Sequence, residues 1–185
     1  METKDLKYCY KYPHPSVTTD CVILGWDGKK LHVLLIERGR EPYKGCWAFP
    51  GGFLNMDESA EEGAARELQE ETGLQGIPLR QFHTFSQPDR DPRERVITIA
   101  YYAVIRWQKI QAGDDAARAQ WFPLDAIPAL AFDHRLILHT ALQELHRQIY
   151  PEERNFHSIL PPDCSVQELQ QIKKAIHDRQ KEHNF

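Results

Sequence analysis

The sequence predicts a single α/β domain built around a mixed β-sheet. Segments rich in β-branched and aromatic residues alternate with segments whose apolar residues recur at helical spacing. At 185 residues the chain is long enough to bury one substantial core, and its apolar fraction of 41% lies slightly below the globular average. We therefore expect one domain in which helices pack against a sheet.

Four segments are expected to form strands. Residues 17–24 are rich in β-branched side chains and precede a turn at residues 26–29. The nearly continuous apolar run of residues 31–36 is typical of a strand that is buried on both faces at the centre of a sheet. Residues 96–105 form the longest run of this kind, and residues 121–124 predict a short strand that a proline stops.

Three segments are expected to form helices. The first covers residues 59–72, with a capping box at its start and Gly73 as its C-terminal stop. The second begins at Asp133 as N-cap and ends before Pro151, and the third covers residues 165–183.

The composition favours a small-molecule partner in the cytoplasm. The 23 basic and 27 acidic side chains give a net charge of -4, which argues against nucleic-acid binding and against an anionic membrane surface. The four cysteines are scattered without a C-x-x-C pair, which predicts reduced thiols rather than a disulfide framework or a zinc site. The charged first 15 residues predict no signal peptide, and no apolar run approaches the roughly 18 residues that cross a bilayer.

Glu67, Glu70 and Glu71 carry the chemical prediction. Their spacing of i, i+3 and i+4 places three carboxylates on one helix face, where they repel one another unless a cation lies between them. Oxygen ligands without histidine or cysteine favour Mg²⁺ or Mn²⁺, and an incompletely ligated ion takes phosphate oxygens as further ligands. Taken alone, three glutamates also fit an ordinary solvated helix face.

Neighbouring residues support the metal interpretation. Arg66 stands four residues before Glu70, at the spacing of an ion pair that orients a carboxylate. Gly51 and Gly52 precede the helix, where backbone without a side chain can approach an ion or a phosphate closely.

The stretch from Gly52 to Leu74 resembles the signature of the Nudix hydrolases. It matches the pattern G-x5-E-x7-R-E-U-x-E-E-x-G-U, where U is aliphatic, at every fixed position. The resemblance implies a Nudix-type α/β/α sandwich with a mixed β-sheet, and hydrolysis of a nucleoside diphosphate linked to a moiety X with Mg²⁺ or Mn²⁺. It also implies roles for individual residues: metal ligands at Glu67, Glu70 and Glu71, an orienting arginine at Arg66, a first acidic position at Glu58 and a leading glycine at Gly52.

Three segments outside this signature, residues 34–39, 47–52 and 86–93, resemble the ADP-ribose pyrophosphatase branch and the related Nudix-like regulators of NAD metabolism. This likeness implies that ADP-ribose is cleaved to AMP and ribose 5-phosphate, with another nucleotide sugar as the alternative substrate. Arg90 and Arg93 are expected to bind the diphosphate or ribose hydroxyls, although a solvated turn also explains them.

Asp114 and Asp115 are candidates for a water-activating carboxylate, because some ADP-ribose hydrolases take one from a loop at this place. The alternative is that both are ordinary exposed loop residues.

The alternative to an enzyme is an ADP-ribose-sensing transcriptional regulator with a C-terminal winged helix. Only 35 residues follow Tyr150, which is short for a three-helix unit with a wing, and their charges are mixed. We therefore expect a hydrolase domain in residues 1–150 and a helical appendage in residues 151–185. The appendage is either a dimerisation element of a homodimer or the remnant of a winged-helix domain. A third interpretation, a Nudix fold kept only for binding, is weakened by the intact metal-ligand positions.

Overall fold

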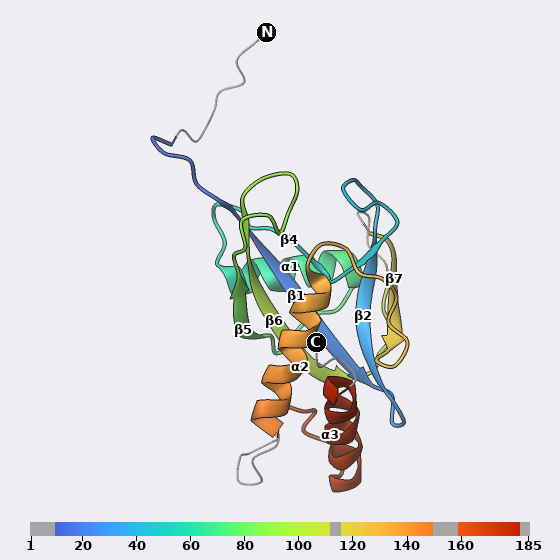
Figure 1. Ribbon diagram of the computed structural model, residues 1–185. Coiled ribbons are helices and arrows are strands. Elements are labelled where there is room, and N and C mark those ends of the chain that lie inside the picture. The colour runs from blue at the N-terminus through green and yellow to red at the C-terminus, as the bar shows by residue number, and fades with distance from the viewer. Residues whose placement is uncertain (1–9, 112–115, 150–158, 182–185) are drawn as a thin grey trace.

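The computed structural model describes residues 10–111, 116–149 and 159–181, and it confirms the predicted fold class, a mixed sheet with helices on both faces (Figure 1). The strands are β1 (Ser16–Trp26), β2 (Leu31–Arg38), β3 (Trp47–Ala48), β4 (Gly51–Phe53), β5 (Arg80–Phe85), β6 (Val96–Arg106) and β7 (Ala116–Pro123). The helices are α1 (Ala60–Thr72), α2 (His134–Ile149) and α3 (Val166–Lys181).

The two longest strands run parallel at the centre of the sheet. β1 pairs with β6 along its whole length, and the main path of the sheet is β3-β2-β1-β6-β5. β2 pairs antiparallel with the end of β1 and with β7, so the strand predicted at residues 31–36 is indeed an inner strand. Beyond their hairpin β1 and β2 diverge (Figure 1), and β4 pairs with the start of β1 while β3 pairs with the end of β2. We call this divergence the fork between β1 and β2. The backbones of β1, β2, β3 and β4 surround the space inside it.

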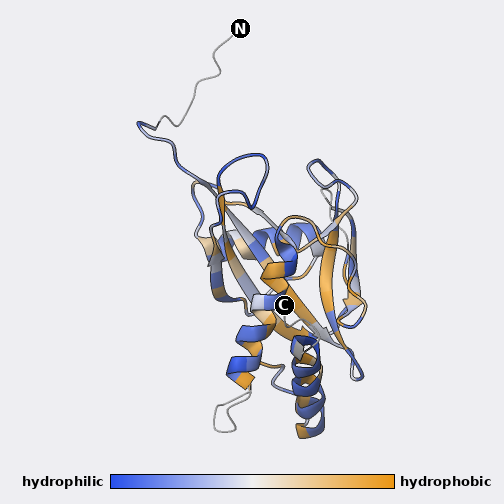
Figure 2. Cartoon of the chain, in the orientation of Figure 1, coloured by the Kyte–Doolittle hydropathy of each residue, from blue (hydrophilic) through white to orange (hydrophobic). Residues whose placement is uncertain are grey.

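Each face of the sheet is covered by its own hydrophobic cluster. Cys21 and Ile23 of β1 pack with Ala64 and Leu68 of α1, as the apolar spacing of that helix predicts. The alternate residues of β1 face α2 and α3 in the larger cluster. Figure 2 shows the apolar residues gathered on the strands and on parts of the helices, while the loops at the edge of the sheet are hydrophilic.

The ends of α1 follow the predicted signals. Ser59 Oγ accepts a hydrogen bond from the N–H of Glu62, Glu62 accepts one from the N–H of Ser59, and Gly73 ends the helix with a left-handed φ of 74°.

α2 begins at His134, directly after Asp133, and the carboxylate of Asp133 receives two hydrogen bonds from Arg90.

Other boundaries differ from the sequence predictions. β7 begins at Ala116 rather than near Trp121, because pairing with β2 continues through an alanine-rich stretch of low β-propensity. β3, β4 and β5 were not predicted from the sequence. β3 and β4 are only two and three residues long, and β5 is a largely exposed strand with a polar sequence.

The C-terminal helix shares the larger core. Ile172 and Ile176 of α3 are buried with the apolar residues of α2 and of the sheet. Glu168 accepts a hydrogen bond of 3.0 Å from the indole N–H of Trp26 and ion-pairs with Arg106 at the end of β6. The described cysteines, Cys21, Cys46 and Cys164, are free thiols.

Across the described ranges, no helix combines the length and the apolar character that crossing a bilayer requires.

Candidate active site

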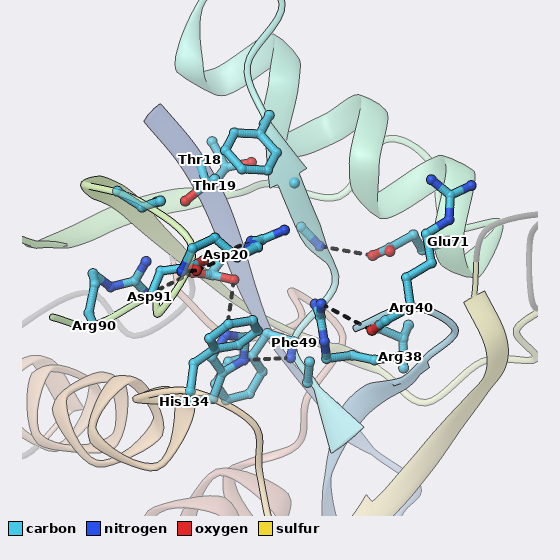
Figure 3. Close-up of a pocket in the computed structure, with 18 of the residues that line it drawn as sticks. Thr18, Thr19, Asp20, Arg38, Arg40, Phe49, Glu71, Arg90, Asp91 and His134 are labelled. Atoms are coloured by element: carbon cyan, nitrogen blue, oxygen red, sulfur yellow. Dashed lines mark hydrogen bonds and ion pairs between the residues drawn. The ribbon is translucent and has the colours of Figure 1, made fainter. Parts of the chain in front are cut away.

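The fork between β1 and β2 contains a polar cavity of about 290 Å³ (Figure 3). Its walls come from the first half of β1, the end of β2, the segment at residues 48–53, the loop before β6 and the start of α2. Glu71 from α1, here called the glutamate helix, also borders the cavity, so one of the three conspicuous carboxylates of the sequence faces it.

The three glutamates of α1 that are expected to bind metal face different surroundings. Glu71 is partly buried, and its Oε2 accepts a hydrogen bond of 2.9 Å from the N–H of Gly51. Burial raises the pKa of Glu71 to about 8, and the negative charges of Glu67 and Asp20 act in the same direction. The side chain of Glu67 is 15% exposed and that of Glu70 is 58% exposed. Burial also raises the pKa of Glu67.

Arg66 links three carboxylates. Its Nε and NH2 donate to the two oxygens of Glu58 at 2.9 and 2.7 Å, and its NH1 donates to Glu67 at 2.8 Å and to Glu70 at 3.1 Å. These hydrogen bonds from Arg66, with a further one from the N–H of Asn55, lower the pKa of Glu58 to about 2. Glu58 thus orients the guanidinium of Arg66, and Arg66 in turn orients the carboxylates of Glu67 and Glu70.

The chemistry of the donors fits a hard divalent cation, although the described part of the chain has no ready-made cluster of three metal-binding side chains. Glu67 and Glu70 are turned towards Arg66, and Glu71 is turned towards Gly51. Burial raises the pKa of Glu67 and of Glu71 and so disfavours their ionised forms, and a bound cation would restore them. Gly52 provides the room for this, because a Cβ atom there would lie 2.4 Å from Oε1 of Glu67.

The two arginines expected to bind substrate have different environments. The side chain of Arg90 is 5% exposed, and its guanidinium donates to both oxygens of Asp133 at 2.9 and 2.7 Å. Arg93 is 40% exposed, and Asp91 holds its Nε and NH2. Arg93 is therefore the more accessible of the two to a ligand. Asp114 and Asp115 lie outside the described residues.

A buried polar network that sequence reasoning missed forms the floor of the cavity. Nδ1 of His134 accepts a hydrogen bond of 2.9 Å from the N–H of Phe49, so the neutral ring carries its proton on Nε2, which lies 3.6 Å from Oδ1 of Asp20. Burial lowers the pKa of His134, which favours this neutral form. Thr98 donates to Asp20 at 2.7 Å. The available signal was Asp20, a charged residue in the middle of a strand-forming segment.

Residues 14–145 match the model of the NUDIX domain, and the chain therefore belongs to the Nudix family. Nudix hydrolases generally use divalent metals.

Three relatives indicate where in this family the chain lies. It is 42% identical to an ADP-ribose pyrophosphatase of Methanocaldococcus jannaschii over 138 residues, which is 75% of this chain and 79% of the relative. It is 33% identical to the ADPR responsive transcriptional repressor NtrR of Acinetobacter baylyi over 170 residues, which is 89% of this chain and 68% of the relative. Among solved structures, the NUDIX domain of Shewanella oneidensis NrtR, complexed with ADP ribose, superposes with a TM-score of 0.68 at 31% identity, covering 75% of this chain and 94% of that chain.

Proposed function

We propose that this protein is a pyrophosphatase that cleaves ADP-ribose to AMP and ribose 5-phosphate with Mg²⁺ or Mn²⁺. The observation that carries the proposal is the position of Glu71, which belongs to a complete Nudix signature and borders the polar cavity between β1 and β2. The 42% identity to an ADP-ribose pyrophosphatase supports this choice of substrate.

The residues of the chain have separate roles in this proposal. Glu67, Glu70 and Glu71 hold the cation, while Arg66 and the N–H of Gly51 orient their carboxylates. When bound, the cation supplies positive charge to the diphosphate oxygens and acidity to the attacking water. Because Arg66 and the N–H of Gly51 already orient these carboxylates, the groups can act through position and electrostatics once the cation is bound.

Two further roles complete the proposal. Arg93 binds the diphosphate, because Asp91 fixes its guanidinium at the cavity wall. The proton of the attacking water passes to a carboxylate, for which a glutamate of α1 and the pair Asp114 and Asp115 are the candidates.

We also propose that the protein acts in the cytoplasm as a homodimer. The free thiols of the described cysteines support a reducing compartment. The dimer is proposed from the sequence, because Ile172 and Ile176 of the C-terminal helix are buried in this chain's own core. Analytical ultracentrifugation of the full chain would test it.

A second candidate function is ADP-ribose-dependent repression of transcription. The observation in its favour is the match to the Acinetobacter baylyi repressor, which spans 89% of this chain. The net charge of -4 argues against it, because DNA binding gains much of its affinity from basic side chains that neutralise phosphates. Specific retardation of promoter DNA at physiological salt, relieved by ADP-ribose, would favour the repressor, whereas we expect none.

A panel of nucleotides tests the proposed substrate. With Mg²⁺ or Mn²⁺ present, we expect ADP-ribose to exceed nucleoside triphosphates and diadenosine polyphosphates in kcat/KM by tenfold or more, a difference of about 1.4 kcal/mol in transition-state stabilisation. The products are read as AMP and ribose 5-phosphate by chromatography. A tenfold preference for a triphosphate would refute ADP-ribose as the substrate. It would not bear on the proposal that the glutamates of α1 bind the metal.

A further inference from the structure

Four side chains form a continuous stack along the wall of the cavity, in the order Phe53, Arg93, Phe132 and Arg38. The guanidinium carbon of Arg93 lies 5.4 Å from the ring centroid of Phe53 and 5.8 Å from that of Phe132. The guanidinium carbon of Arg38 lies 4.6 Å from the ring centroid of Phe132. These residues, here called the arginine–phenylalanine stack, come from four separate segments of the chain, and all four line the cavity.

Both guanidinium groups of the stack are held in place. Nε and NH2 of Arg93 donate to Asp91 at 3.0 and 2.7 Å. Nε of Arg38 donates to the carbonyl of Pro42 at 2.9 Å, and its NH2 donates to the carbonyl of Arg40 at 3.5 Å. Within the described residues NH1 of neither arginine makes a hydrogen bond. Each arginine therefore keeps N–H groups for a ligand.

Phe132 is fixed between the two arginines. Its backbone has a left-handed φ of 51°, a conformation that a residue with an aromatic side chain rarely adopts. Such a conformation persists only where the surroundings determine it, and here the ring also packs edge-on against Tyr43 at a centroid distance of 4.7 Å. The ring of Phe132 is thus packed against Tyr43 as well as against the two guanidinium groups.

The stack concentrates positive charge beside the glutamate helix. Burial lowers the pKa of Arg38, and the positive charge of Arg93 acts in the same direction. Arginine stays protonated nevertheless, so two like charges face the same ring. An anion that accepts hydrogen bonds from both arginines would relieve their repulsion, and Glu71 borders the same cavity.

We propose that the arginine–phenylalanine stack is the receptor for two adjacent phosphoryl groups of a nucleoside diphosphate, one on Arg38 and one on Arg93. Phe132 is a positioning residue that sets the spacing between the two guanidinium groups. This inference rests on the proposed function, because it takes a diphosphate as the substrate. It adds roles for Arg38 and Phe132, to neither of which the sequence assigned one.

The test compares binding of a monophosphate and a diphosphate to the full chain. Isothermal titration calorimetry with Mg²⁺ measures the Kd of AMP and of the methylene-bridged analogue of ADP, which resists cleavage between its phosphates. In Phe132→Leu we expect the affinity for the diphosphate analogue to fall roughly tenfold and that for AMP by less than about twofold, because one guanidinium suffices for a single phosphate. Phe132→Tyr keeps an aromatic ring and is expected to bind both as the unmodified protein does.

A second variant keeps the test decisive if Phe132→Leu does not fold. Arg38→Lys preserves the charge but removes the planar group that stacks on the ring, so it is expected to cause the same selective loss for the diphosphate analogue. Equal losses for both nucleotides, or no loss, in a variant that folds would overturn the inference. If the selective loss occurs in a protein that hydrolyses a different nucleoside diphosphate derivative, the ADP-ribose proposal fails and the stack stands.

Discussion

Glu58 shows how one residue outside the row of helix glutamates controls their orientation. Both of its oxygens are hydrogen-bonded by Arg66, and the same arginine reaches Glu67 and Glu70. Because the pKa of Glu58 is lowered to about 2 in the folded state, the ionised carboxylate stabilises the fold. That stabilisation is present above the ordinary pKa of 4.5 and is lost as the pH falls through about 2.

The resulting prediction concerns the melting temperature of Glu58→Gln. At neutral pH the variant is expected to melt several degrees below the unmodified protein, and the gap should close as the pH falls from 4.5 towards 2. Circular dichroism melts at a series of pH values measure this. Asp57→Asn, at the exposed neighbouring position, is the matched control and should leave the melting temperature unchanged. A gap that stays constant down to pH 2 would contradict the assigned pKa.

Within the element β4, alanine substitutions at two adjacent glycines are expected to have different effects, one on the stability of the fold and the other on activity. In Gly51→Ala the new Cβ atom would lie 2.0 Å from the carbonyl oxygen of Thr19, so backbone must move, and we expect a loss of about 2–4 kcal/mol in unfolding free energy. In Gly52→Ala the obstacle is the flexible end of Glu67, 2.4 Å away. That carboxylate can turn aside at small cost, so the fold should survive.

Activity then distinguishes the two variants. Gly52→Ala displaces a proposed metal ligand, so kcat for ADP-ribose should fall at least roughly tenfold while the denaturant midpoint hardly moves. Urea unfolding and initial rates measure the two effects. If Gly52→Ala lost as much stability as Gly51→Ala and kept full kcat, Gly52 would serve packing rather than the metal site.

How far sequence predicts these elements depends on the range of the interactions. The glutamate row and the ends of α1 follow from spacing within one helix, so they were predictable from local residues. β3 and β4 exist because the β1–β2 fork offers them partners, which no local pattern reveals. The contact of His134 with Phe49 likewise joins residues far apart in the chain. So does the ion pair of Arg90 with Asp133, whereas Arg93 pairs with the nearby Asp91.

At the scale of the whole molecule, α3 is expected to behave as part of the main core. Ile172 is fully buried with residues of α2 and the sheet. Its replacement by alanine should cost about 2–4 kcal/mol of unfolding free energy and shift a single cooperative transition. Val166→Ala, at a 73% exposed position of the same helix, should change the unfolding free energy by less than about 0.5 kcal/mol. A separate low-stability transition in Ile172→Ala would instead indicate an independent C-terminal unit.

At this scale the fold and the chemistry meet in the fork between β1 and β2, which brings Glu71 to the cavity where we propose that a diphosphate is cleaved. The most direct measurement is the kcat of Glu71→Gln for ADP-ribose with Mg²⁺, with circular dichroism as the check on folding. Because the change removes a carboxylate from the helix that we propose binds the metal, without removing its bulk, we expect kcat to fall at least about a hundredfold in a folded protein. A folded Glu71→Gln protein that releases AMP at the unmodified rate would contradict it.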